Sequence, residues 1–234
     1  MMGLLLCLAA LLSTVVEGAN VNISLFVMSK CPDAAHCETA FLPEVLRRVG
    51  SIVDLQVDYI AAPEASAPSG FSCMHGESEC EGDAAQLCVQ RYFPAGLNID
   101  SLGSLSWTAF LRCVDDFNSS STSKIPENTA PCLTSLGVDA ATVKKIEACA
   151  AGPEGRELMR ESVERTLHAC PKQKSGRCTS CTMLLNGEVA CIADGGVWPV
   201  CPVGTTADAW TAAVCKAYEG PGPRPAACSE IVLT

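Results

Sequence analysis

The sequence predicts a mixed α/β fold with a parallel strand-helix-strand unit, a helical insertion, and a closing hairpin followed by a helix. Three observations support this prediction. Two apolar-polar alternations, over 21–28 and 52–60, enclose a helical pattern. Helical periodicity dominates the middle of the chain, over about 83–172. Asn186-Gly187 then separates two short apolar runs, as in a tight hairpin.

The first unit reads as a strand, a helix and a second strand. VNISLFVM, residues 21–28, and IVDLQVDYI, residues 52–60, both alternate as strands do. Between them, a helix is expected over about 36–49, kinked by Pro43 and closed by Gly50. A crossover of this length predicts that the two strands pair in parallel and that their connection is right-handed. An Ala-, Pro- and Ser-rich loop over 61–70 follows.

Helical patterns fill the middle of the chain, and a hairpin and a helix close it. Helices are expected over 104–117, 138–150 and 153–170, with Asp139 and Pro153 at positions typical of helix starts. The hairpin spans 181–192, and the last helix spans 205–220. The domain should therefore cover 20–220, after a leader over 1–19 and before a tail over 221–234.

Composition and charge exclude some partners. With 26 acidic and 16 basic residues, the net charge is -10, and no basic stripe is available for nucleic acid or an anionic membrane. The apolar stretch over 3–16 is too short to span a bilayer, which favours a cleaved signal peptide over an N-terminal anchor. No membrane attachment is expected after cleavage. Two sequons predict glycosylation at Asn22 and Asn118.

The chain contains sixteen cysteines. Removing the leader removes Cys7 and leaves an odd number. In an oxidising compartment most of the others should form disulfides, and at least one should remain unpaired or redox-active. Spacing alone does not give the pairings, although Cys191 and Cys201 most simply close the intervening loop.

The stretch CMHGESECEGDAAQLC, residues 73–88, is the most specific motif. It resembles the signature of the gamma-interferon-inducible lysosomal thiol reductase family, Cys-Gln-His-Gly-x2-Glu-Cys-x2-Asn-x4-Cys. Met74 and Asp83 depart from that signature, and the positions that match it are Cys73, His75, Gly76, Glu79, Cys80 and Cys88. The resemblance, which extends over about residues 22–220, implies a disulfide-rich thioredoxin-like fold, a lumenal or secreted location, and reduction of protein disulfides.

Read without the family, the signature is ambiguous. Its cysteines could simply staple a loop to a helix. His75 and Glu79 could orient backbone groups or border a redox site, but a structural role is the simpler interpretation for His75, as it is for His168 on its helix.

The family's Cys-x-x-Cys pair corresponds to Cys31 and Cys37, which are separated by five residues instead of two. In a regular helix, residues i and i+6 have Cα atoms roughly 10 Å apart, whereas a disulfide needs about 4.4 to 6.8 Å. We therefore expect residues 32–34 to form a turn, with Asp33 as N-cap, that brings the two cysteines together. The alternatives are a permanent Cys31–Cys37 staple, or separate partners for each cysteine.

Cys31 takes the place of the nucleophile in this comparison. Lys30, His36 and the first amides of the helix favour its thiolate, and Asp33 opposes it. Pro32 and His36 echo the Cys-Pro-His-Cys of strongly oxidising relatives, which leaves the direction of catalysis open.

Cys181 is a second departure. Thioredoxin-like folds place a cis-proline before the hairpin strand, and counting back from Asn186-Gly187 places Cys181 there. Cys178 and Cys181 also spell Cys-x-x-Cys, which could be a second redox pair, half of a zinc site or two disulfide halves. Zinc would need a matching second pair, so no metal is expected.

The leading hypothesis is a thiol-disulfide oxidoreductase, a reductase rather than an oxidase, in a secreted, endolysosomal or vacuolar location. Cys31 would attack disulfide-containing protein substrates, and Cys37 would resolve the mixed disulfide. No bound cofactor is expected; a small thiol would serve as co-substrate. The alternative is a redox-inactive, disulfide-rich binding or structural protein with the same fold. Oligomeric state is not predictable from the sequence.

Overall fold

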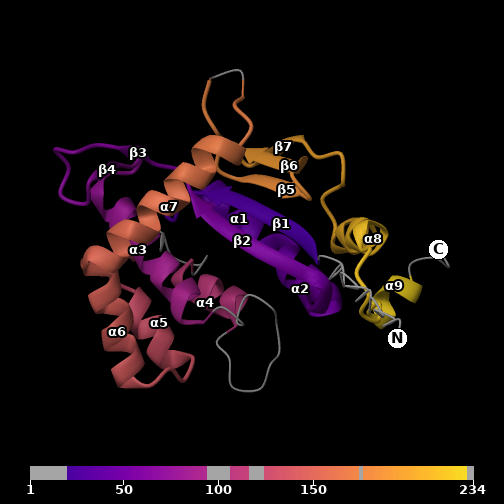
Figure 1. The fold of residues 1–234 in the computed structure, drawn as a ribbon, viewed down its shortest axis with the longest axis horizontal. Helices are drawn as coiled ribbons and strands as arrows, with labels where there is room; N and C mark the ends of the chain where they lie inside the picture. The colour runs from indigo at the N-terminus through magenta and orange to yellow at the C-terminus, as the bar shows by residue number, and fades with distance from the viewer. Residues whose placement is uncertain (1–19, 94–105, 116–123, 174–175, 231–234) are drawn as a thin grey trace, which may run out of the picture.

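The computed structural model describes residues 20–93, 106–115, 124–173 and 176–230. Its centre is a five-stranded sheet in the order β2-β1-β5-β6-β7 (Figure 1). The strands are β1 (Val21–Val27), β2 (Val53–Tyr59), β5 (Thr182–Leu185), β6 (Glu188–Asp194) and β7 (Val197–Val200). The expected α/β architecture is confirmed. The expected leader and Asn118 lie outside the described residues.

The first unit is the predicted parallel crossover. β1 and β2 pair in parallel, with Val21 opposite Val53. The chain between them forms two helices, α1 (Pro32–Ala40) and α2 (Leu42–Val49), with Gly50 as C-cap of the second. The expectation of a single helix over 36–49 is therefore wrong. The helical segment begins earlier, at Pro32, and is interrupted at Phe41. Pro43 lies at the beginning of α2, where its missing N–H costs no hydrogen bond.

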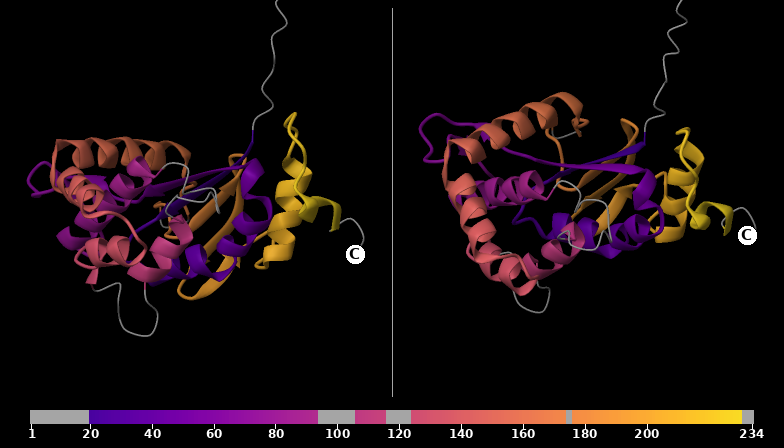
Figure 2. Two further views of the ribbon diagram at one scale, coloured as in Figure 1. Left: turned by 90° about the horizontal axis from the view of Figure 1, so that it is seen from below. Right: turned by 60° about the horizontal axis from the view of Figure 1, so that its bottom comes forward.

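In the described part of the sequence, five helices come between β2 and β5 along the chain. They are α3 (Glu77–Tyr92), α4 (Trp107–Val114), α5 (Thr129–Ser135), α6 (Ala140–Ala151) and α7 (Pro153–Ala169). Asp139 caps α6 and Pro153 begins α7, as predicted. α3 packs against α6 and α7, and α7 packs along β2. Figures 1 and 2 show these helices gathered at one end of the sheet.

Short elements complete the fold. The expected loop over 61–70 includes one short strand, β3 (Ala62–Pro63), which pairs antiparallel with β4 (Phe71–Ser72) directly after the loop. The turn between β5 and β6 is at Asn186 and Gly187, both with positive φ, as the type I′ prediction requires. The last helices are α8 (Ala207–Ala217) and α9 (Ala226–Glu230), at the opposite end of the sheet from α3–α6 (Figure 1).

Seven disulfides cross-link the described chain. They are Cys37–Cys181, Cys73–Cys80, Cys88–Cys149, Cys113–Cys132, Cys170–Cys178, Cys191–Cys201 and Cys215–Cys228. The predicted Cys191–Cys201 closure is confirmed, but it encloses a second hairpin, β6–β7, and not an irregular loop. The signature cysteines staple a loop to α3 through Cys73–Cys80, as the simpler interpretation holds.

Candidate functional site

The site is centred on Cys31, the last residue of the short connection, 28–31, between β1 and α1. Its backbone N–H donates to the carbonyl of Met28, and its extended conformation makes it the N-cap residue of α1. Cys31 is the one free cysteine of the described chain, and it is partly exposed. A thiol that can accept a partner therefore lies at the carboxyl end of a central strand, the usual location of a reactive group in an open α/β sheet.

Cys37 does not pair with Cys31. It is fully buried and bonded to Cys181, also fully buried, with their Cα atoms 6.5 Å apart. The expected turn over 32–34 is absent because the helix already begins at Pro32. Six residues along a helix separate two Cα atoms by roughly 10 Å, which is too far for a disulfide.

Cys181 lies directly before β5, where the sequence comparison predicts the cis-proline position. Its peptide bond with Ser180 is cis. The Cys31 thiol donates to the Ser180 carbonyl, with a sulfur-to-oxygen distance of 3.8 Å, and the Met28 amide donates to the Ser180 hydroxyl at 3.1 Å. The segment 180–181 thus lies between the free thiol of Cys31 and the buried sulfur of Cys37.

The family-like signature supports the loop that precedes Cys31. The Glu79 carboxylate, fully buried on α3, accepts from the Lys30 amide at 3.3 Å and pairs with the His75 ring. The Lys30 ammonium donates to the Ser78 hydroxyl at 2.8 Å. Glu79, paired with His75, therefore holds the backbone of Lys30, the residue before Cys31.

Asp83 extends the same support. Its carboxylate accepts from the Ser29 amide at 2.9 Å, and the Ser29 hydroxyl donates to the Glu79 carbonyl at 3.2 Å. Asp83 stands where the family signature has Asn, and here its side chain fixes the end of β1.

The β6–β7 hairpin covers the other side of α1. Asp33 accepts from the amides of Gly195 and Gly196, both at 2.8 Å. Its expected role as N-cap is therefore wrong, because it lies within the first turn and faces the hairpin. The exposed His36 ring lies 5.6 Å from the Trp198 ring. Pro32, at the first position of α1, begins the helix.

Three carboxyl groups are buried together beneath the site. Glu38 on α1 and Asp115 after α4 are each 3% exposed, and Asp83 is 0% exposed. Burial raises the pKa of Glu38 well above the usual range, and the charges of Asp115 and Asp83 raise it further. Burial raises the pKa of Asp83, with Glu79 adding to the rise, and raises the pKa of Asp115 to about 7. One Glu38 oxygen has no hydrogen-bond partner in the described chain.

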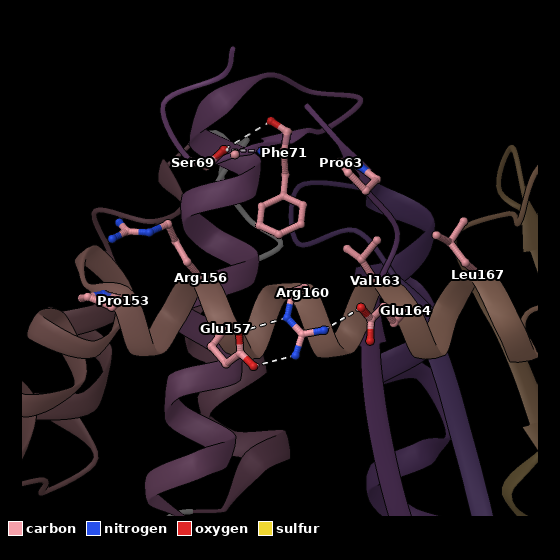
Figure 3. A pocket seen from close by; sticks show the side chains of 11 residues that line it. Pro63, Ser69, Phe71, Pro153, Arg156, Glu157, Arg160, Val163, Glu164 and Leu167 are labelled. Atoms are coloured by element: carbon pink, nitrogen blue, oxygen red, sulfur yellow. Dashed lines mark hydrogen bonds and ion pairs between the residues drawn. The ribbon is translucent and has the colours of Figure 1, made fainter. Parts of the chain in front are cut away.

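Two surface hollows adjoin α7. One, of about 490 Å³, lies between α7 and the β3–β4 loop (Figure 3). Its lining residues in the described chain include no cysteine, and Arg160 there is paired with Glu157 and Glu164. The other, of about 590 Å³, is a groove that reaches Met28 and is bordered by the exposed Met74 and Leu167. The groove, and not the hollow of Figure 3, adjoins the loop that carries Cys31.

The remaining predicted positions have structural surroundings. Cys178 and Cys181 do not pair with each other but belong to two different disulfides, one of the three alternatives for this motif. Gly76 precedes α3 with a positive φ, and Cys88 joins α3 to α6 through Cys149. Glycosylation at Asn22, half-buried in β1, stays a prediction.

Sequence reasoning missed several features of the site. The Cys37–Cys181 bond joins residues 144 positions apart, which no local pattern reveals. The burial of Glu38 and Asp115 had only a weak signal in the sequence, namely that these acidic residues lie within apolar helical patterns. The described ranges contain no cluster of three or more metal-ligating side chains and no helix long and apolar enough to cross a membrane.

Comparison with known proteins agrees with the fold. Reduced DsbG, a disulfide bond oxidoreductase from Mycobacterium tuberculosis, is 14% identical and superposes with a TM-score of 0.52 over 91% of this chain and 83% of its own. The thiol-disulfide oxidoreductase MdbA from Actinomyces oris is 12% identical, with a TM-score of 0.53 over 88% and 84%. These likenesses establish a thioredoxin-like fold.

Sequence comparison gives the family. GILT-like protein 1 of Drosophila melanogaster is 24% identical over 170 residues, which make up 69% of this chain and 66% of that protein. Residues 22–136, which include Cys31, Cys37 and the whole signature, match the family model described as gamma interferon inducible lysosomal thiol reductase (GILT). These matches place residues 22–136 of the chain in the gamma interferon inducible lysosomal thiol reductase family.

Proposed function

We propose that this protein reduces disulfide bonds of protein substrates, with Cys31 as the nucleophile. The observation that carries the proposal is a partly exposed free thiol at the start of α1, in a chain whose other described cysteines are all bonded. The fold is that of thiol-disulfide oxidoreductases, and the family description supports the reductive direction.

The proposed reaction begins when the Cys31 thiolate attacks one sulfur of a substrate disulfide. The attack forms a mixed disulfide and releases the first substrate thiolate. A second cysteine of the protein then attacks the Cys31 sulfur and releases the other substrate thiolate. The sequence predicts Cys37 for this role, but in the structure Cys37 is bonded to Cys181. Two equivalents of a small thiol return the oxidised protein to its dithiol form. No metal or bound cofactor is needed for these exchanges.

The proposed location is a secreted or endolysosomal lumen. Seven disulfides in the described chain are typical of proteins that fold in an oxidising compartment. The net charge of -10 argues against nucleic acid as a partner. Disulfide-containing proteins are the proposed partners.

The Cys37–Cys181 bond favours a second candidate function, that of a redox-inactive binding protein with a thioredoxin-like fold. The expected Cys31–Cys37 pair is not formed, and Cys37 is bonded to another cysteine. The two candidates differ in what Cys31 does.

Insulin reduction by the purified protein with a small-thiol donor, between about pH 4.5 and about pH 7, distinguishes the candidates. We expect activity above the thiol-only rate, and its loss in Cys31→Ser. The matched control is Cys215→Ser with Cys228→Ser, which removes a disulfide near the C-terminus and leaves the site intact. Equal rates for the intact protein and Cys31→Ser would reject Cys31 as the nucleophile and favour the binding protein.

A further inference from the structure

We propose that Cys181, and not Cys37, is the cysteine that resolves the mixed disulfide on Cys31, and that Cys37–Cys181 is the oxidised form of the resting enzyme. This inference rests on the proposed function, because it requires that Cys31 attacks the substrate. It adds a further reacting residue and gives the buried disulfide a part in the cycle.

Geometry favours Cys181 over Cys37 as the direct partner of Cys31. Cys31 and Cys37 are fixed at the two ends of a helical segment that keeps their Cα atoms roughly 10 Å apart. The Cys31 sulfur instead lies 3.8 Å from the carbonyl oxygen of Ser180, the residue that precedes Cys181. The residue that precedes Cys181 therefore contacts Cys31, and Cys181 itself is bonded to Cys37.

The three cysteines differ in how far a substrate can reach them. Cys37 and Cys181 are both 0% exposed, whereas Cys31 is partly exposed. A large substrate can therefore approach Cys31 but not the other two. The buried pair can exchange electrons with the surroundings only through Cys31, unless the protein opens locally.

The sequence of bonds follows from these positions. In the fully reduced enzyme, the Cys31 thiolate attacks the substrate and forms a mixed disulfide. The Cys181 thiolate then attacks the Cys31 sulfur, which forms Cys31–Cys181 and releases the second substrate thiolate. The Cys37 thiolate attacks the Cys181 sulfur, which forms Cys37–Cys181 and frees Cys31. The substrate disulfide gains two electrons, and the Cys37 and Cys181 thiols lose them.

A small thiol reverses the last steps. Cys31 attacks Cys181 and frees Cys37, and the thiol then attacks the sulfur of the partly exposed Cys31 and frees Cys181. A second thiol molecule attacks the sulfur of the first, which frees the Cys31 thiolate and releases the two small thiols as their disulfide. Each external exchange therefore passes through Cys31.

The first experiment needs no protein substrate, and its variant removes none of the seven disulfides of the described chain. The oxidised intact protein and Cys31→Ser are exposed to glutathione under native conditions, and the Cys37–Cys181 bond is followed by alkylation and peptide mass mapping. We expect the bond to open in the intact protein and to persist in Cys31→Ser. Cys191–Cys201, mapped in the same samples, is the internal control and should open at the same rate in both. Equal opening of Cys37–Cys181 in both proteins would overturn the proposal.

The second experiment traps the intermediates. Reduced Cys181→Ser and reduced Cys37→Ser are mixed with insulin, quenched with acid and mapped. We expect Cys181→Ser to accumulate insulin on Cys31, and Cys37→Ser to release insulin and accumulate Cys31–Cys181. Accumulation on Cys31 in Cys37→Ser, or none in Cys181→Ser while the intact protein still reduces insulin, would overturn the role of Cys181. If the intact protein fails to reduce insulin, the proposed function itself fails.

Discussion

The buried carboxyl of Asp115 should make the protein less stable as pH rises, and Asp115→Asn should remove much of that loss. The pKa of Asp115 is raised by burial from 3.8 to about 7. Between these two values the unfolded chain has released the proton and the folded chain has kept it. Stability from this group is therefore complete below about pH 4 and is lost as pH rises to about 7.

The magnitude follows from the size of the pKa rise. At 1.36 kcal/mol for each pKa unit, a rise of about three units corresponds to ~4 kcal/mol of unfolding free energy. For a domain of this size, 1 kcal/mol corresponds to roughly 2–4 °C in Tm, which predicts a shift of roughly 8–16 °C.

The assay is urea unfolding of the intact protein and Asp115→Asn at about pH 4 and about pH 8. The two proteins should be similar at the lower pH, and the variant should be the more stable at the higher pH. Glu157→Gln is the control: Glu157 is exposed, and its hydrogen bond with Arg160 lowers its pKa, so its contribution is lost as pH falls. Parallel pH profiles for the intact protein and Asp115→Asn would refute the argument.

Other substitutions test the surroundings of the site. Glu38→Gln should also stabilise the folded protein at neutral pH and not at acid pH, because burial raises the pKa of Glu38; thermal melts across pH measure this. Asp33→Ala should cost about 1–2 kcal/mol by removing two hydrogen bonds to the β6–β7 turn, with faster hydrogen exchange there. In Gly82→Ala, the added methyl would overlap Ile125 and lie 2.7 Å from the Ser29 hydroxyl, costing about 1–3 kcal/mol in urea unfolding. Asp139→Ala should lower stability by about 1 kcal/mol, and Asp139→Asn should not, because asparagine also caps helices.

Local patterns predicted the larger elements because local physics determines them. The alternation over 21–28 reflects a strand with a buried face, and the turn at Asn186-Gly187 reflects two residues that tolerate positive φ. Asp139 and Pro153 marked the starts of two helices for similar local reasons. β7 escaped prediction because it is an edge strand with three exposed residues and an internal proline, Pro199, and therefore shows no alternation.

The site was less predictable because tertiary contacts define it. The expected N-cap at Asp33 assumed that this carboxylate serves its own helix, whereas it binds amides more than 160 positions away. The link from Glu79 to the backbone of Lys30 likewise depends on how α3 meets the end of β1. Cysteine pairing has no local signal, which is why the motif of Cys178 and Cys181 left three alternatives open.

The two departures from the family pattern become one arrangement in the folded protein. With two intervening residues, the helix would hold two cysteines roughly 5 Å apart, and they could exchange directly. Five intervening residues move Cys37 beyond the reach of Cys31, to the place where the hairpin loop enters β5. A proline in that loop would leave Cys37 without a partner there, whereas Cys181 is bonded to Cys37 and follows Ser180, whose carbonyl accepts from the Cys31 thiol. With Cys181 as the proposed resolving cysteine, disulfide exchange can pass from Cys31 to Cys37 through Cys181, even though the spacing keeps Cys31 and Cys37 apart.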